Sequence, residues 1–347
     1  MTKRIFPRLT GLLALAGALL APISAARADS LELAFDRTFG TELRAPRDLP
    51  AGPRQFVASG VQSQNVSGFE ARLFQLADAG QGRIGVAALD LTTGRAVAVL
   101  GDQPFPMAST SKIAIVATFL DGVDKGRWKL SDRFPLMVPT RSAKFSSLRA
   151  PVVAGQSMSA ETLIELAITR SNNQATDALL AAIGGPSAVN RWLASAGVTG
   201  LRMDRDIATL VRDDGEFDPA RMIDPRDSAT PRAMVGLLTG LYQGRWLSPE
   251  SRGVLIGAME RCLTGKHRLS GQLPEGTLVA HKTGTLSNTS SDVGLIHTPD
   301  GHVIAVAVYV TGQGSKAARD ERIASIARAI YDESQTEGSG MRRSAQR

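Results

Sequence analysis

Strand-forming patterns lie near both ends of this 347-residue chain, whereas helix-forming patterns fill its middle. Apolar residues recur at helical spacing from about 109 to 247, and amphipathic patterns predict two further helices at 67–79 and 316–331. The strand patterns are rich in Val, Ile, Leu and Ala and are separated by turn signals such as Thr92-Thr93-Gly94. They cover residues 83–90, 95–100, 277–280, 293–298 and 302–310.

This order of elements predicts an α/β (α+β) fold. One antiparallel sheet is built from both termini and flanked by helices, and an all-α lobe is inserted between its halves. We expect one domain over residues 67–335, in which 67–108 and 235–335 form the α/β lobe and 109–234 form the helical lobe. Residues 336–347 are expected to be a polar tail.

Residues 1–28 have the pattern of a secretory signal peptide. Lys3, Arg4 and Arg8 precede a short apolar stretch, and Ala26-Arg27-Ala28 offers a small-x-small cleavage site. The apolar stretch is well short of the ~20 residues that a membrane-spanning helix needs. We therefore expect an exported, periplasmic protein with no membrane attachment after signal cleavage.

Residues 29–66 are rich in Pro, Arg and Gly and lack a long amphipathic period, which predicts an N-terminal extension. Without the four basic residues of the leader, the formal charge of +7 falls to +3. The sequence has no basic stripe interleaved with aromatic residues, so we expect no nucleic-acid partner. A monomer is the expected state.

Cysteine and histidine usage gives no sign of a metal centre. Cys262 is the only cysteine, so the chain cannot form an internal disulfide bond. It ends an apolar helical pattern, and we expect it to be a buried structural thiol. The four histidines lack metal-ligand spacing such as H-E-x-x-H. We expect neither a metal nor an organic cofactor.

A serine and a lysine stand three residues apart where the helical middle begins. The segment 105–112 ends in Ser109-Thr110-Ser111-Lys112 and is followed by an apolar run. Residues at i and i+3 share a helix face, so the Ser109 hydroxyl and the Lys112 amine can meet. A serine is a weak nucleophile unless a base takes its proton, and a buried lysine of lowered pKa can do so. The alternative is an ordinary capped helix with a solvated lysine.

Two further motifs follow, Ser171-Asn172-Asn173 and His281-Lys282-Thr283-Gly284-Thr285. S-x-x-K, S-x-N and K-T-G in this order are the signature of penicillin-recognising serine enzymes. The chain resembles the class A β-lactamases from about residue 67 to 331. Other segments similar to family sequences are Phe105-Pro106-Met107, Ile183-Gly184-Gly185-Pro186, Met203-Asp204-Arg205, Arg226-Asp227-Ser228-Ala229-Thr230-Pro231 and Thr264-Gly265-Lys266-His267-Arg268.

The resemblance implies catalytic roles for three residues. Ser109 would be the acylated nucleophile, Lys112 its proton acceptor, and Ser171 the group that passes a proton to the leaving lactam nitrogen. The backbone N–H groups of Ser109 and Thr285 would form the oxyanion hole. Substrate binding is implied for Asn173, Lys282, Thr283, Thr285 and Arg268. The alternatives are a helix-interior amide for Asn173 and a solvated surface charge for Arg268.

The sequence departs from the family where the water that hydrolyses the acyl-enzyme is held. Read forward from Arg205, the family's glutamate and asparagine positions hold Ile207 and Val211, which can neither activate nor hold a water. The segment up to Asp227 is also longer than the family pattern. Counting back from Asp227 places Asp214 at the glutamate position; Asp214, Glu216 or no residue would then be the base.

Three functions remain compatible with these motifs. The first is a serine β-lactamase that forms an acyl-enzyme on Ser109 and deacylates slowly because Ile207 replaces the usual glutamate. The second is a D-alanyl-D-alanine peptidase or amidase acting on cell-wall peptides, since the acylating groups are the same. The third is a non-hydrolytic penicillin-binding sensor. The expected partner is accordingly a small β-lactam or a cell-wall peptide.

Overall fold

The structure is a computed structural model that describes residues 54–55 and 68–344. The predicted signal peptide at 1–28 and nearly all of the 29–66 extension lie outside the described residues. Within that extension, β1 (Arg54–Gln55) pairs with β8 (Met222–Ile223). None of the described helices is both long enough and apolar enough to cross a membrane.

Five antiparallel strands form the main sheet, as the sequence predicts. Their spatial order is β10-β11-β12-β2-β3, so β2, the first of these strands in the chain, pairs with β12, the last, and β3 lies at the edge beyond β2. The edge strand β10 carries the K-T-G motif. The strands are β2 (Gly82–Asp90), β3 (Ala96–Val99), β10 (Leu278–Leu286), β11 (Thr289–His297) and β12 (Val303–Gly312).

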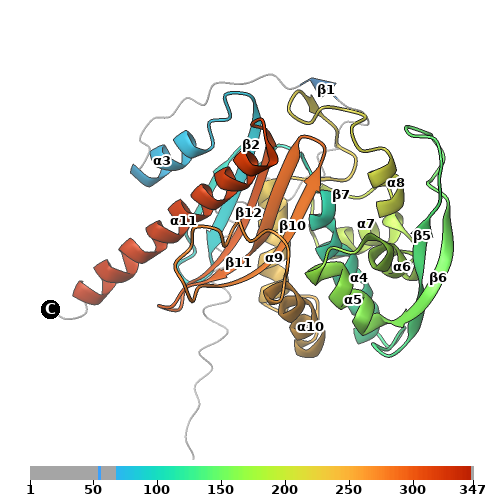
Figure 1. Ribbon diagram of the computed structural model, residues 1–347. Helices are drawn as coiled ribbons and strands as arrows, with labels where there is room; N and C mark the ends of the chain where they lie inside the picture. Colours follow the sequence, from blue (N-terminus) through green and yellow to red (C-terminus); the bar gives the residue numbers. More distant parts are fainter. Residues whose placement is uncertain (1–53, 56–67, 345–347) are drawn as a thin grey trace, which may run out of the picture.

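Helices cover both faces of this sheet. On one face, α3 (Gly68–Leu76) and α11 (Lys316–Ser344) pack over an apolar layer, and Figure 1 shows α11 lying diagonally across the strands. On the other face, α9 (Pro231–Tyr242) packs against the same strands. Because both faces are covered, β12 is buried along nearly its whole length. The closing helix α11 continues beyond its predicted end at residue 331.

The inserted lobe is mostly helical, and side-chain caps fix where several helices begin. Ser159 accepts a hydrogen bond from the backbone of Thr162, and Asn172 accepts one from the backbone of Ala175. The helices are α4 (Lys112–Asp124), α5 (Ala160–Thr169), α6 (Asn173–Ile183), α7 (Pro186–Ser195) and α8 (Ile207–Arg212), with α10 (Pro249–Glu260) packed beside them.

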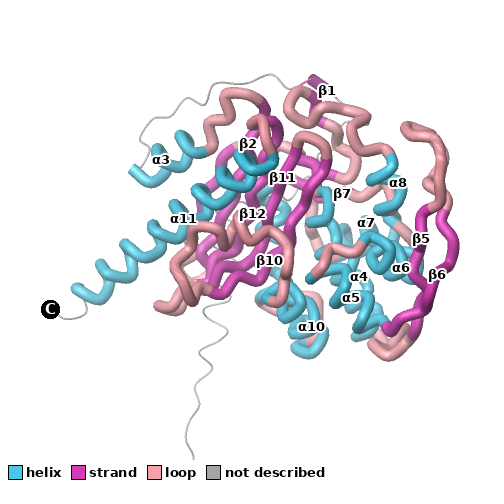
Figure 2. Tube along the Cα trace, in the orientation of Figure 1, coloured by secondary structure: helices cyan, strands magenta, loops and turns pink. Residues whose placement is uncertain are grey.

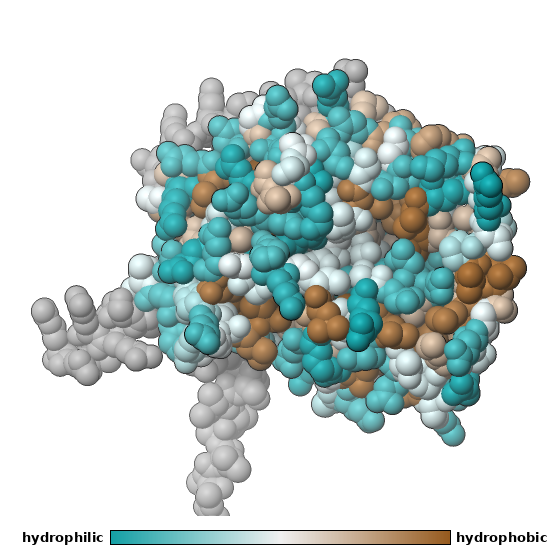
Figure 3. Space-filling model, in the orientation of Figure 1, coloured by the Kyte–Doolittle hydropathy of each residue, from teal (hydrophilic) through white to brown (hydrophobic). Residues whose placement is uncertain are grey.

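The lobe is not purely helical, in contrast to the all-α lobe that the sequence predicts. A long hairpin, β5 (Arg133–Pro139) and β6 (Val152–Ser159), lies at its outer edge (Figure 2). Residues along both strands are exposed or only partly buried. Buried and exposed residues therefore do not alternate, as they do in a strand with one face in the core. Val152 and Val153 are exposed there, and Figure 3 shows hydrophobic residues over this edge.

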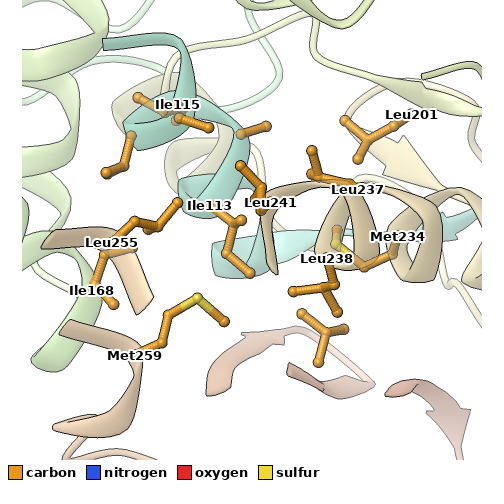
Figure 4. Close-up of a cluster of buried hydrophobic side chains, with 14 of the residues drawn as sticks. Ile113, Ile115, Ile168, Leu201, Met234, Leu237, Leu238, Leu241, Leu255 and Met259 are labelled. Carbon is orange, nitrogen blue, oxygen red and sulfur yellow. The ribbon is translucent and has the colours of Figure 1, made fainter. Parts of the chain in front are cut away.

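The hydrophobic core lies directly beneath the S-x-x-K segment. Helix α4 is buried on every side from Lys112 to Leu120. Figure 4 shows Ile113 and Ile115 of this helix among side chains of α5, α9 and α10. Each such buried side chain contributes about 1.5–3 kcal/mol to folding. The core therefore holds the first turn of α4 in a fixed position.

Candidate active site

Ser109 lies in a short 3-10 turn, η2 (Ala108–Ser111), that leads directly into α4. Ala108 has a positive φ of 49°, a conformation that is uncommon for a residue with a Cβ and typical of constrained functional sites. The hydroxyls of Thr110 and Ser111 each donate 2.8 Å hydrogen bonds to backbone oxygens of the same turn. Of the residues in the turn, only Ser109 is partly exposed. The turn therefore presents Ser109 alone to solvent.

The Lys112 ammonium is fully buried and lies against the S-x-N motif. Its Nζ donates hydrogen bonds to the Ser171 carbonyl (2.6 Å) and to Asn173 Oδ1 (2.7 Å), and it lies 3.3 Å from Ser171 Oγ. Burial, followed by the positive charge of Lys282, holds the pKa of Lys112 well below its ordinary value, while Asp177 opposes the shift. This is the electrostatic environment that a neutral lysine base needs.

Ser171 stands between two lysines. Lys282 Nζ donates to Ser171 Oγ at 2.9 Å and to the Thr283 carbonyl at 3.0 Å. Ser171 has a positive φ of 55°, so its backbone is constrained as well. A hydroxyl in contact with two amines can accept a proton from one side and donate one on the other. The geometry therefore suits a proton relay from Lys112.

Asn173 is the first residue of α6, and its side chain is exposed. Its Oδ1 accepts the bond from Lys112, which leaves its amide N–H groups for a ligand. The alternative prediction, an amide in the helix interior, does not describe this position. Lys112, Ser171, Asn173 and Lys282 thus form one hydrogen-bonded network between the helical lobe and β10.

The K-T-G strand lies very close to the nucleophile turn. A Cβ on Gly284 would stand 2.7 Å from the Met107 carbonyl oxygen and 3.1 Å from Ala108 Cβ, so only glycine fits there. Because β10 is an edge strand, the main chain on its open side is not paired with another strand. This approach is the one that an oxyanion hole made by Ser109 and Thr285 requires.

Arg268 is buried behind β10, with 2% of its surface exposed, so it is not a solvated surface charge. Its guanidinium donates to the Gly284 carbonyl (2.7 Å), the Thr285 hydroxyl (2.7 Å) and the Asp320 carboxylate (2.7 Å). These bonds fix the Thr285 hydroxyl on the exposed part of the strand. In this structure Arg268 therefore positions Thr285.

Comparison with known proteins gives the same family that the motifs indicate. The model of the β-lactamase enzyme family matches residues 68–334. The β-lactamase of Streptomyces albus G is 30% identical over 78% of this chain and 86% of its own length. β-Lactamase VEB-1 of Pseudomonas aeruginosa is 28% identical over 78% of this chain and 90% of its own length.

Solved structures identify the class. The class A β-lactamase GNCA4, described as that of the last common ancestor of Gram-negative bacteria, has a TM-score of 0.66 and 36% identity, and the match covers 77% of this chain and 99% of that one. The chain belongs to the class A β-lactamase family. These findings favour the serine β-lactamase over the peptidase and sensor alternatives, and they confirm the predicted fold.

The loop that carries the family's glutamate is closed in this β-lactamase by an ion pair. Arg205 Nε lies 2.6 Å from Asp227 Oδ2, and Asp227 Oδ1 accepts the backbone N–H groups of Asp204 (2.8 Å) and Arg205 (3.0 Å). Counted forward from Arg205, the glutamate position is Ile207, which is 2% exposed and part of the core. The asparagine position is Val211, which is 48% exposed.

Asp177 is a buried residue of this β-lactamase that holds the loop and that the sequence analysis missed. Its two carboxylate oxygens accept the backbone N–H groups of Ile207 and Ala208, each at 2.8 Å. Burial raises its pKa to about 6 despite these bonds. Asp177 follows Asn173 by four residues in α6, so it lies on the same helix face. That spacing was the available signal.

Replacing Asp177 with alanine is expected to lower the free energy of unfolding by about 1–3 kcal/mol, because two buried N–H groups lose their acceptors. The pKa of Asp177 is higher in the folded than in the unfolded protein, so protonation of Asp177 favours the folded state. This stabilisation is complete at a pH below the pKa of the unfolded chain and is lost as the pH rises through about 6. The loss should therefore be larger at pH 5 than at pH 8. Urea denaturation measures both values, with Asp214→Ala as a control that stays within about 1 kcal/mol of wild type.

Asp214 and Glu216, the candidate bases found by counting back from Asp227, have other partners. Asp214 accepts the backbone N–H of Ser287 in the β10–β11 turn (2.9 and 3.0 Å), and Glu216 pairs with Arg226 (2.7 Å). Both carboxylates line a cavity of about 60 Å³ between the long loop and that turn. Its lining includes none of Ser109, Lys112, Ser171 or Asn173. These contacts indicate that the acidic stretch holds the loop against the sheet.

Proposed function

We propose that this β-lactamase is acylated efficiently at Ser109 and releases its acyl-enzyme slowly. One observation carries the proposal: Lys112, Ser171 and Lys282 are joined by hydrogen bonds next to the turn that holds Ser109, whereas the position of the deacylating glutamate is occupied by the buried Ile207. Residues suited to acylation are thus present, whereas the usual base for deacylation is not. β-Lactams are proposed as substrates because the relatives are named β-lactamases.

Acylation begins with proton transfer from Ser109 to Lys112. The lowered pKa of Lys112 raises the fraction of the amine that is neutral and can accept this proton. The Ser109 oxygen attacks the lactam carbonyl while the N–H groups of Ser109 and Thr285 stabilise the oxyanion. Ser171, in contact with both Lys112 and Lys282, then protonates the leaving nitrogen.

Substrate capture depends on β10. The Lys282 ammonium attracts a substrate carboxylate, and the hydroxyls of Thr283 and Thr285 offer hydrogen bonds to it. Arg268 assists by fixing the Thr285 hydroxyl. On the opposite side, the Asn173 amide binds the side-chain amide of the substrate.

Deacylation needs a base that activates a water beside the ester. Ile207 has no polar group, and both oxygens of the Asp177 carboxylate, which contacts the backbone of residues 207 and 208, already accept backbone N–H groups. Loss of a general base slows such a step by about 10²–10⁴-fold. With nitrocefin we expect one stoichiometric burst followed by a much slower steady state. Turnover that continues at the burst rate would refute slow deacylation.

The acylation rate constant kcat/KM is expected to decline above about pH 8. Burial lowers the pKa of Lys282 to about 8, so its ammonium loses the proton, and its attraction for the substrate carboxylate, as the pH rises through that value. Lys282→Arg is the matched control, because a guanidinium stays protonated throughout this range. The decline should disappear in that variant. A decline that survives in Lys282→Arg would assign the titration to another group.

We also propose that residues 1–28 direct export to the periplasm and that the mature protein is monomeric. The proposal is supported by the charged start, short apolar stretch and cleavage site of the leader. Mass spectrometry of protein recovered from the periplasm should give a chain that begins at Asp29, and light scattering should give the mass of one chain. An uncleaved chain or a dimer would contradict the respective part.

A further inference from the structure

The β5–β6 loop, residues 140–151, is bound along its backbone by the end of α8. Asp213 Oδ1 accepts the backbone N–H of Phe145 at 2.7 Å. The Arg212 guanidinium donates two bonds, of 3.0 and 2.8 Å, to carbonyl oxygens of the loop, and Thr209 Oγ1 accepts a backbone N–H of the loop at 2.9 Å. Figure 1 shows α8 beside this end of the hairpin. These bonds hold the loop in one position.

Phe145 is held in a strained conformation that keeps its ring at the surface. Its φ is 58°, which is uncommon for a residue with a bulky side chain. The Asp213 carboxylate that fixes its N–H is buried and is itself bound to Arg212 by two bonds of 2.7 and 2.8 Å. Phe145 and Leu148 are nonetheless 52% and 75% exposed. A strained backbone that presents apolar side chains to solvent is typical of ligand-binding segments.

Phe145 and Leu148 line one wall of a cavity of about 450 Å³. Small-molecule sites in proteins have volumes of about 300–1,000 Å³, so the cavity is large enough for such a ligand. The opposite wall belongs to the long loop that the Arg205–Asp227 ion pair closes. The cavity therefore lies between two walls that are both fixed. Its lining includes none of Ser109, Lys112, Ser171 or Asn173.

The charges around the cavity favour an anion. Arg141, Lys144 and Arg149 of the β5–β6 loop are exposed, and their side chains have no partner among the residues that the structure describes. Residues 133–160 contain no acidic residue. The opposite wall has one excess negative charge, against three positive charges on the loop. Its carboxylates are paired with arginines, Asp204 with Arg202, Asp213 with Arg212, Asp227 with Arg205, and both Glu216 and Asp224 with Arg226.

We propose that this cavity binds a small amphiphilic anion, a carboxylate or sulfonate with an aromatic or alkyl body. The apolar body contacts Phe145 and Leu148, which burial against a ligand removes from water. The anionic group pairs with Arg149, a lining residue whose guanidinium is free to donate two parallel hydrogen bonds. Binding at this site is non-covalent and does not rest on the proposed function.

Titration of the folded protein with anilinonaphthalene sulfonate tests the site, since this aromatic anion becomes fluorescent in an apolar environment. We expect one dye per chain to bind, more weakly as sodium chloride is raised. Arg149→Gln should weaken the affinity at least about tenfold through loss of the charge-assisted hydrogen bond. Phe145→Ser should weaken it to a similar extent through loss of apolar contact. Binding that does not saturate, or that both variants leave unchanged, would overturn the proposal.

Two control variants separate this cavity from other places where the dye could bind. Arg141→Gln removes a cation of the same loop that does not line the cavity, and its affinity should stay within about twofold of wild type. Lys282→Gln removes the cation of the substrate site, and its dye affinity should also be unchanged. A loss of affinity in Lys282→Gln that is absent from Arg149→Gln would place the dye in the substrate site and overturn the proposal. None of these readouts requires acylation, so failure of the proposed function would not alter them.

Discussion

Replacing Ser109 with alanine is expected to lower the acylation rate by about 10⁶-fold, the usual consequence of removing a catalytic nucleophile. Ser109 is the partly exposed hydroxyl of its turn, and the buried Lys112 follows it by one helical turn. Without that oxygen, Lys112, Ser171 and Lys282 have no group to activate. Intact-protein mass spectrometry with benzylpenicillin should detect no adduct.

Ser111→Ala is the matched control for this prediction. It removes a neighbouring hydroxyl of the same turn, which donates only to the Ala108 carbonyl. Its adduct should form as in wild type, with a loss of stability of about 1 kcal/mol. Labelling that persists in Ser109→Ala and disappears in Ser111→Ala would show that Ser111, and not Ser109, is the nucleophile.

The double replacement Ile207→Glu with Val211→Asn is expected to accelerate deacylation by about 10²–10⁴-fold. The backbone at 207 is already fixed by Asp177, and the loop is closed by the Arg205–Asp227 ion pair. A glutamate placed there would have its backbone held in a defined position. The lifetime of the acyl-enzyme, measured after removal of free drug, gives the rate directly.

The control for the glutamate is the same double variant with glutamine at 207. Glutamine has nearly the shape of glutamate but is not a base at neutral pH. Its acyl-enzyme should persist as long as that of wild type. Equal acceleration by glutamate and glutamine would show that loop packing, and not a missing base, limits deacylation.

The sheet and the catalytic motifs were accessible from the sequence because both depend on short-range patterns. Buried strands give continuous apolar runs, and the S-x-x-K, S-x-N and K-T-G motifs carry their chemistry at fixed spacing. The structure brings Lys112, Ser171 and Lys282 together as expected. The β5–β6 hairpin was missed because its strands, which are exposed or half-buried along their length, lack that pattern.

What the sequence could not give depends on contacts between distant residues. Asp177 supports the loop through backbone groups 30 and 31 residues away, and its spacing from Asn173 gives its helix face but not these partners. The contribution of Arg268 likewise depends on its burial behind β10. Cys262 was expected to be a buried structural thiol because its neighbours in sequence are apolar, whereas the structure leaves it half-buried. Burial and partner geometry decide these roles.

The central claim is that this β-lactamase acylates well and deacylates slowly. The most direct measurement is intact-protein mass spectrometry of the mature protein mixed with benzylpenicillin and sampled from seconds to hours. We expect an adduct with the mass of the whole drug to form within the first samples and to persist for hours. An adduct that clears within seconds while hydrolysed drug accumulates would contradict it, and would require an efficient base despite Ile207.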